Sequence, residues 1–103
     1  MAFTSWRGTV GVVKPSAGSM SYMDLVRLLP DGIGLIPTYL DIHERTVEEY
    51  HAAIPKFEKA VAELVAQGCD FVHPEGAPPF VVHGYAGEKK IVAGWVKKYK
   101  TPI

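Results

Sequence analysis

The sequence has little of several features that commonly identify a protein's class. It contains one cysteine, Cys69, so no disulfide can form within the chain and a zinc site built on several thiolates is excluded. Its 11 basic and 11 acidic side chains cancel, which argues against a surface for nucleic acid or an anionic membrane. Its apolar runs are far shorter than the ~20 residues needed to span a bilayer, and no signal peptide is visible. We therefore expect a protein of the reducing cytoplasm.

Motifs for metals and nucleotides are also missing from the sequence. The four histidines are scattered at spacings unlike a helical His-x-x-x-His pair, so their spacing does not predict a metal site: His43, His51, His73 and His83. No Gly-x-Gly-x-x-Gly follows the first apolar segment, and no Gly-Lys-Ser/Thr occurs. The sequence therefore offers no motif for nucleotide binding.

The pattern of apolar residues divides the 103 residues, enough for one domain, into alternating strands and helices. Three short apolar segments are expected to be buried strands: residues 9–13, 33–37 and 69–73. Ser21 opens a capping-box pattern before a short helix, and Thr46 opens another before an amphipathic helix that ends near Gly68. A third helix is expected over residues 86–99, with lysines on its solvent face, and residues 101–103 resemble the start of a fourth strand.

This alternation predicts an α/β fold, with an open parallel sheet of three to four strands and helices on both faces. Because crossovers between parallel strands are right-handed, we expect one flavodoxin-like domain over residues 1–103. In such a sheet, ligands bind beyond the carboxyl ends of the strands, near the point where the strand order reverses. Three loops should lie there, at residues 14–19, 38–43 and 73–80.

These loops offer polar groups that could line a small-molecule pocket. The side chains are Lys14, Ser16, Ser19, Thr38, Tyr39, Asp41, His43, His73 and Glu75, and backbone amides around Gly18 and Gly76 add anion donors. Each has a simpler structural explanation: Lys14 and Glu75 as solvated charges, for example, or Ser19 as a helix cap. Cys69 comes at the amino end of its strand, and we interpret it as a small core residue. From spacing alone, the sequence predicts a pocket but no particular reaction.

Several stretches carry a resemblance to known families. They are Gly11-Val12-Val13-Lys14-Pro15-Ser16-Ala17-Gly18, Arg27-Leu28-Leu29-Pro30-Asp31-Gly32, residues 46–50 and the helix end Leu64-Val65-Ala66-Gln67-Gly68-Cys69-Asp70. In this order they resemble the N-terminal half of arylmalonate decarboxylase and maleate cis–trans isomerase, both of the aspartate/glutamate racemase superfamily. The resemblance extends over nearly the whole chain.

The resemblance implies that two pseudo-symmetric halves clamp a small carboxylic acid without any cofactor. Racemases and the isomerase use one cysteine from each half, whereas the decarboxylase keeps only that of the C-terminal half and stabilises an enediolate with amide and hydroxyl donors. The cysteine position of the N-terminal half corresponds here to Gly76, which favours decarboxylase-like chemistry. The next two positions supply hydroxyl donors in the decarboxylase, but they correspond here to Ala77 and Pro78, which have no hydroxyl group. The implied lining of this half of the pocket is Lys14, Pro15, Ser16, Thr38, Tyr39, Gly76 and Ala77.

The second cysteine of such proteins belongs to a C-terminal half that this sequence does not contain. We therefore expect the chain to bind small dicarboxylic acids, to be inactive alone, and to pair with a second copy of itself or with the missing half. Two alternatives stay open. One is another enzyme, either a maleate isomerase or racemase-like enzyme, or a hydratase or isomerase with Glu75 or His73 as its base. The other is a non-catalytic carboxylate-binding or assembly module.

Overall fold

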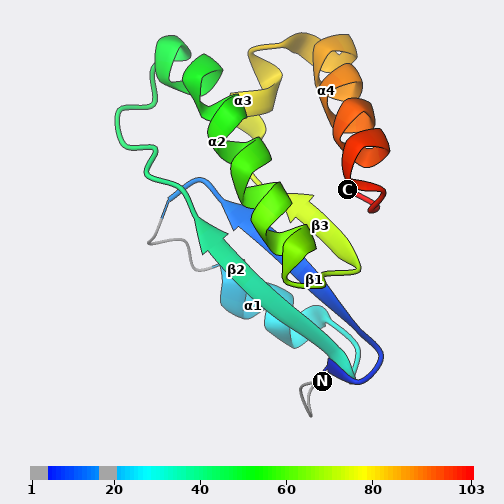
Figure 1. The fold of residues 1–103 in the computed structure, drawn as a ribbon. Coiled ribbons are helices and arrows are strands. Elements are labelled where there is room, and N and C mark those ends of the chain that lie inside the picture. Colours follow the sequence, from blue (N-terminus) through cyan, green and yellow to red (C-terminus); the bar gives the residue numbers. More distant parts are fainter. Residues whose placement is uncertain (1–4, 17–20) are drawn as a thin grey trace.

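The computed structural model describes residues 5–16 and 21–103, which form an α/β domain (Figure 1). The elements follow in the order β1 (Gly8–Lys14), α1 (Ser21–Leu28), β2 (Ile33–Tyr39), α2 (Val47–Ala66), β3 (Phe71–Pro74), α3 (Ala77–Val81) and α4 (Gly84–Tyr99). These strands pair in parallel in the order β2-β1-β3. The predicted open parallel α/β sheet is confirmed, and its strand order is that of a flavodoxin-like half-domain.

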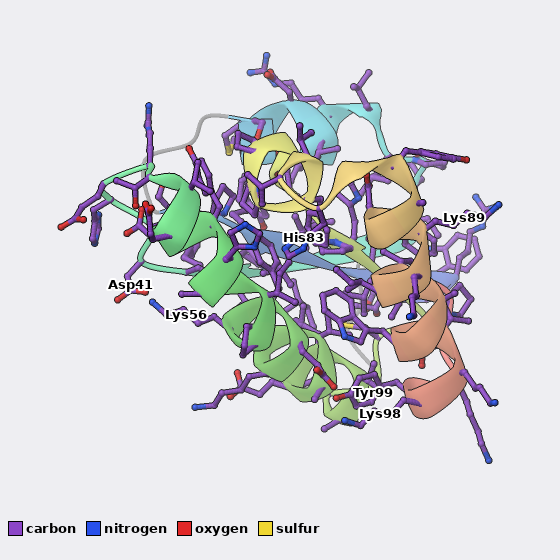
Figure 2. All side chains as sticks on the ribbon, turned by 90° about the horizontal axis from the view of Figure 1, so that it is seen from above. Asp41, Lys56, His83, Lys89, Lys98 and Tyr99 are labelled. Carbon is purple, nitrogen blue, oxygen red and sulfur yellow. The ribbon has the colours of Figure 1, made fainter. Side chains whose placement is uncertain are left out.

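The strand order explains why helices cover both faces of the sheet. The chain moves outward from β1 to β2 and then returns across β1 to reach β3. Since both crossovers are right-handed, their helices α1 and α2 lie on opposite faces. The two views agree with this placement, and they show α4 on the side of α2 (Figures 1 and 2). The short α3 packs against both α2 and α4.

The core lies between the sheet and α2. This helix buries residues at spacings of three and four, which gives it one apolar face: Ala53, Phe57, Ala60, Val61 and Leu64. A Cβ at Gly11 would lie 2.9 Å from Leu64 Cδ1 and 3.0 Å from Cys69 Sγ, so the close approach of α2 to β1 requires a glycine there. Cys69 is buried, and this burial raises the pKa of its thiol, which confirms it as a core residue.

The two capping boxes differ in outcome. Thr46 is the N-cap of α2, and its side chain accepts a hydrogen bond from the Glu49 amide (3.1 Å), as predicted. Ser21 is instead the first residue of α1, and its hydroxyl bonds to the side chains of Lys14 in β1 and of Glu75, which follows β3. Ser19 and Gly18, expected to provide a cap and an anion-binding amide, lie outside the described residues.

The loop expected over residues 73–80 is wrong beyond Gly76, because α3 begins at Ala77. Pro78 and Pro79 explain the difference. Proline in the first turn of a helix has the required φ angle, and its missing amide has no partner to lose there. The short helix places Phe80 in the core, with its ring centroid 5.1 Å from that of Phe57.

The two edges of the sheet have different surroundings. β2 is an outer strand with Pro37 in its middle, opposite Val12 of β1. On the outer side of β3, the Val72 amide donates to the Pro102 carbonyl (3.0 Å), so residues 101–103 lie where the expected fourth strand would pair, although they are not assigned as a strand. Among the described helices, none combines the length and apolar character needed to cross a membrane.

Candidate functional site

The carboxyl ends of the strands meet at one edge, as predicted. The Glu75 amide donates to the Val13 carbonyl (2.7 Å) from one side of β1. From the other side, the Leu40 amide donates to the Lys14 carbonyl (2.8 Å) and the Ile42 amide to the Pro15 carbonyl (3.1 Å). The segment after β1 is thus held between the segments after β2 and β3. It lies at the topological switch point, where α/β proteins commonly bind ligands.

A pocket of about 300 Å³ opens at this edge, and we call it the Arg45 pocket. It is lined by Pro15, Ser16, Ile42, Arg45, Tyr50, Pro78 and Pro79. Its walls are mostly apolar, with a guanidinium and two hydroxyl groups among the lining residues. Small-molecule sites commonly combine apolar walls with a few polar groups in this way, and the volume is at the lower end of their range.

Arg45 has an unusual backbone conformation, with φ = 59°. The left-handed region costs a residue with a side chain roughly 1–2 kcal/mol. Glu49 holds the loop in place, because its carboxylate accepts hydrogen bonds from the amides of Arg45 (2.7 Å) and His43 (3.1 Å). The bond from the Arg45 amide is the main cause that keeps the pKa of Glu49 below its usual value. Backbone strain of this kind is often concentrated at binding sites.

Lys14, the last residue of β1, belongs to a polar network at the carboxyl edge of the sheet. Its side chain is fully buried, and its ammonium group pairs with Glu75 Oε2 and donates to Ser21 Oγ. Ser21 Oγ in turn donates to Glu75 Oε1 (3.0 Å). Burial would raise the pKa of Glu75, but the bonds from Lys14 and Ser21 outweigh burial and lower it. Glu75 is therefore ionised and paired at neutral pH, which makes it a weak general base.

Gly76 connects β3 to α3 in a conformation that favours glycine, with φ = 129°. A Cβ at this position would lie 3.5 Å from Pro15 Cγ and 3.6 Å from both Phe57 Cζ and Pro79 Cδ. A side chain would therefore fit, and only the backbone disfavours one. Ala77 follows as the first residue of α3. The single cysteine, Cys69, precedes the amino end of β3, so the Arg45 pocket has no thiol.

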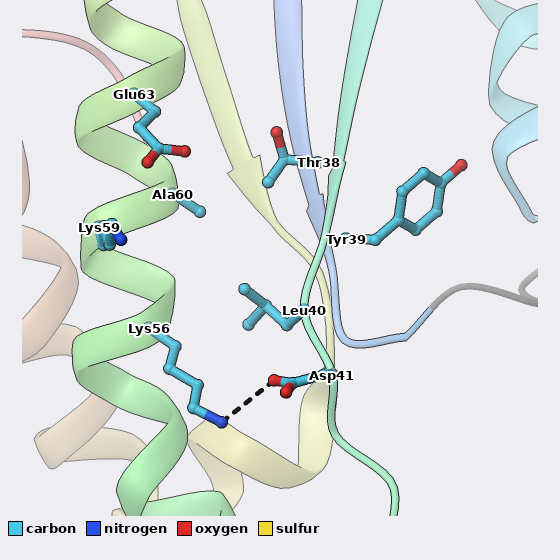
Figure 3. Close-up of a pocket in the computed structure, with 8 residues that line it drawn as sticks. All are labelled: Thr38, Tyr39, Leu40, Asp41, Lys56, Lys59, Ala60 and Glu63. Atoms are coloured by element: carbon cyan, nitrogen blue, oxygen red, sulfur yellow. Dashed lines mark hydrogen bonds and ion pairs between the residues drawn. The ribbon is translucent and has the colours of Figure 1, made fainter.

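Thr38 and Tyr39 line a different depression of about 310 Å³ between β2 and α2, which we call the Lys56 groove (Figure 3). Thr38 points toward α2, whereas the Tyr39 ring points away from it. Asp41 pairs with Lys56 across the groove (3.1 Å), and this contact lowers the pKa of Asp41. The Lys56 side chain is about half exposed and that of Asp41 is largely exposed. The structure therefore does not bring together all the residues grouped from the sequence: Pro15 and Ser16 line the Arg45 pocket, Thr38 and Tyr39 line the groove, and Lys14 and Gly76 line neither.

Sequence reasoning missed part of the pocket lining, namely Ile42, Arg45, Tyr50 and Pro79. The signal for Arg45 was present, because it directly precedes the Thr46 cap and so belongs to the same β2–α2 connection. His43 and His73 are exposed and do not line the pocket.

No protein-family model matches the chain, and no curated protein is significantly similar to it.

Proposed function

We propose that this chain binds small dicarboxylic acids in the Arg45 pocket, as half of a cofactor-independent, decarboxylase-like protein. The main support is the position of Arg45 beside apolar walls at the topological switch point. A guanidinium can bind a carboxylate through two parallel hydrogen bonds. Pro15, Ile42 and Pro79 would pack against the apolar substituent of a substituted malonate.

The groups around the pocket favour binding over catalysis by this chain alone. Loss of carbon dioxide requires donors that stabilise the enediolate, and Arg45 and Ser16 could supply them. The product must then receive a proton on carbon, and the only thiol, Cys69, is in the core. Because Lys14 neutralises Glu75, the alternative of a hydratase or isomerase that uses this carboxylate as its base has less support.

The missing groups would come from a facing half, either a second copy of the chain or a C-terminal half. In the families that the sequence resembles, the ligand lies between two such halves. Large apolar side chains are exposed on α1 and just before β1, and a partner could cover them: Trp6, Met23, Val26 and Leu28. We keep the cytoplasm as the proposed compartment, because Cys69 is a free thiol.

The test is calorimetric titration of the chain with malonate, phenylmalonate and maleate, with malonamide as a neutral control. We expect phenylmalonate to bind most tightly, malonamide not to bind, and no carbon dioxide to be released. Arg45→Ala should weaken binding about tenfold or more, since a charged hydrogen bond contributes roughly 1.5–3 kcal/mol. Arg27→Ala is the matched control, because Arg27 is an exposed arginine on α1, across the sheet from α2.

Each outcome decides between the alternatives. Absence of binding, or equal weakening by Arg45→Ala and Arg27→Ala, would show that the proposed site is wrong. Release of carbon dioxide would make the isolated chain a complete decarboxylase, and conversion of maleate to fumarate would favour the isomerase. Light scattering with and without phenylmalonate would show whether a second copy takes part.

A further inference from the structure

His51 and His83 are brought together although they are far apart in the sequence. His51 is in α2, and His83 is the N-cap residue of α4. Their ring centroids are 4.7 Å apart and their planes are nearly perpendicular, at 87°. Figure 2 shows His83 in the space between α2 and α4. The contact therefore connects the helix that builds the core to the helix packed beside it.

One nitrogen of this pair has no hydrogen-bond partner. Nε2 of His83 is buried, and within residues 5–16 and 21–103 no group bonds to it. Buried polar atoms are bonded in the great majority of cases, so an exception points to a water or an ion that the protein holds. Imidazole nitrogen is a good ligand for zinc, nickel and copper ions.

The two histidines differ in exposure. His83 Nε2 is buried, whereas His51 is exposed on α2, so an ion would reach Nε2 when the His51 ring turns about its side-chain bonds. In the described part of the chain, no third histidine, cysteine or carboxylate completes a larger cluster. An ion bound here would therefore have two protein ligands and would keep water in its other positions, as ions in open sites do.

We propose that His51 and His83 together bind one divalent transition-metal ion, such as Zn²⁺, Ni²⁺ or Cu²⁺, and that the ion connects α2 to α4. The site is separate from the Arg45 pocket, whose lining includes neither histidine. The ion would join the two helices near the start of α4. At the other end of α4, Lys98 Nζ (2.7 Å) and Tyr99 OH (2.9 Å) already donate to Glu58 of α2 (Figure 2).

The experiment is titration of the full chain with Zn²⁺ by calorimetry, with Cu²⁺-induced broadening of backbone NMR signals to locate the ion. We expect one ion per chain, and broadening centred on residues near His51 and His83. A ligand that binds only the folded state also raises the unfolding temperature, so Zn²⁺ should increase it.

Four single variants test the assignment. Loss of one group beside a metal commonly weakens affinity by about 10- to 100-fold, so His51→Ala and His83→Ala should each lower Zn²⁺ affinity at least about tenfold. His43→Ala and His73→Ala remove exposed histidines outside the pair and should leave affinity within about twofold. If His83→Ala does not fold, His51→Ala still decides the question, because His51 is exposed.

Three results would overturn the proposal: no Zn²⁺ binding by the folded chain, unchanged affinity in His51→Ala, or half an ion per chain in a metal-dependent dimer. The last would place the ion between two copies rather than between α2 and α4.

Discussion

Lys14 and Glu75 form an ion pair that joins the carboxyl ends of β1 and β3, below the topological switch point. The two members differ in exposure, since the Lys14 side chain is 0% exposed and that of Glu75 is 29% exposed. Ser21 bonds to both and brings the start of α1 into the same network. The pair therefore fixes three segments at the carboxyl edge of the sheet, directly before Pro15, which lines the Arg45 pocket.

Removing either partner of this pair should destabilise the fold, and by unequal amounts. Glu75→Gln leaves a fully buried ammonium group without its counter-ion, and we expect a loss of about 3 kcal/mol. Lys14→Met leaves a carboxylate that water can still reach, so we expect a smaller loss of about 1–2 kcal/mol. Urea unfolding followed by circular dichroism would measure both values.

The double variant Lys14→Met/Glu75→Gln isolates the interaction between the two residues. Contacting residues commonly couple by about 0.5–3 kcal/mol, so its loss should be smaller than the sum of the single losses. Lys56→Met is the matched control, because it breaks the exposed pair with Asp41 and should cost less than about 1 kcal/mol. If the loss of stability in the double variant equalled the sum of the two single losses, the ion pair between Lys14 and Glu75 would not be stabilising.

The same carboxylate should make stability depend on pH. The pKa of Glu75 is lower in the folded chain than its unfolded value of 4.5. As the pH falls, Glu75 is therefore protonated in the unfolded state before it is protonated in the folded state. The contribution of Glu75 to the free energy of unfolding is fully present above pH 4.5, and it is lost as the pH falls from 4.5 through the folded pKa. The difference in unfolding free energy between the wild-type chain and Glu75→Gln should be largest at neutral pH and shrink in acid. A difference independent of pH would argue against this prediction.

Gly76 should resist substitution because of its backbone and not because of crowding. We expect Gly76→Ala to cost about 1–3 kcal/mol, since its φ of 129° is one that residues with side chains rarely adopt. Gly76→Cys should cost a similar amount, because nothing lies closer than 3.5 Å to the added Cβ. If both variants were as stable as the wild type, glycine would not be required there, and its presence in place of a thiol would need another reason.

Gly94→Ala provides the comparison within the same chain. Gly94 is inside α4, and apart from its chain neighbours and the backbone of its own helix no atom lies within 4 Å of a Cβ added there. Alanine in the interior of a helix is favoured over glycine by roughly 0.5–1 kcal/mol, so this variant should be more stable than the wild type. Thermal unfolding should therefore show a lower unfolding temperature than the wild type for Gly76→Ala and Gly76→Cys, and a higher one for Gly94→Ala.

The fold was readable from the sequence where one periodicity extended over a long segment. Thr46 marks the start of α2 and apolar residues then recur every three or four positions, so the helix was predicted, and Phe57, Val61 and Leu64 of this pattern are buried. Val47, the first apolar residue of the pattern, is instead exposed, and Ala53 and Ala60 are buried in addition. The strands were recognisable because a parallel sheet covered on both faces needs continuous apolar runs. The order β2-β1-β3 is one that the rule of right-handed crossovers allows for an open sheet covered on both faces.

The candidate site was less predictable because it depends on contacts between distant segments. Lys14 was expected to be either a solvated charge or part of the pocket lining, and no local pattern shows that Glu75 and Ser21 meet it inside the protein. The short helix α3 was hidden because proline usually signals a loop, although the first turn of a helix accepts it equally well. Arg45 was missed although it directly precedes the Thr46 cap, because the sequence does not reveal the left-handed backbone conformation that it adopts beside the pocket.

Pro37 has a consequence for how copies of this protein can associate. Proline has no amide hydrogen, so the open edge of β2 lacks a donor at its centre, and an incoming strand would find an interrupted ladder. At the opposite edge, the Pro102 carbonyl already accepts the bond of the Val72 amide. Growth of the sheet from chain to chain, the usual route to fibrillar aggregates, is disfavoured at both sides. We therefore expect two copies to meet through side chains on a face of the domain rather than by pairing of their strands.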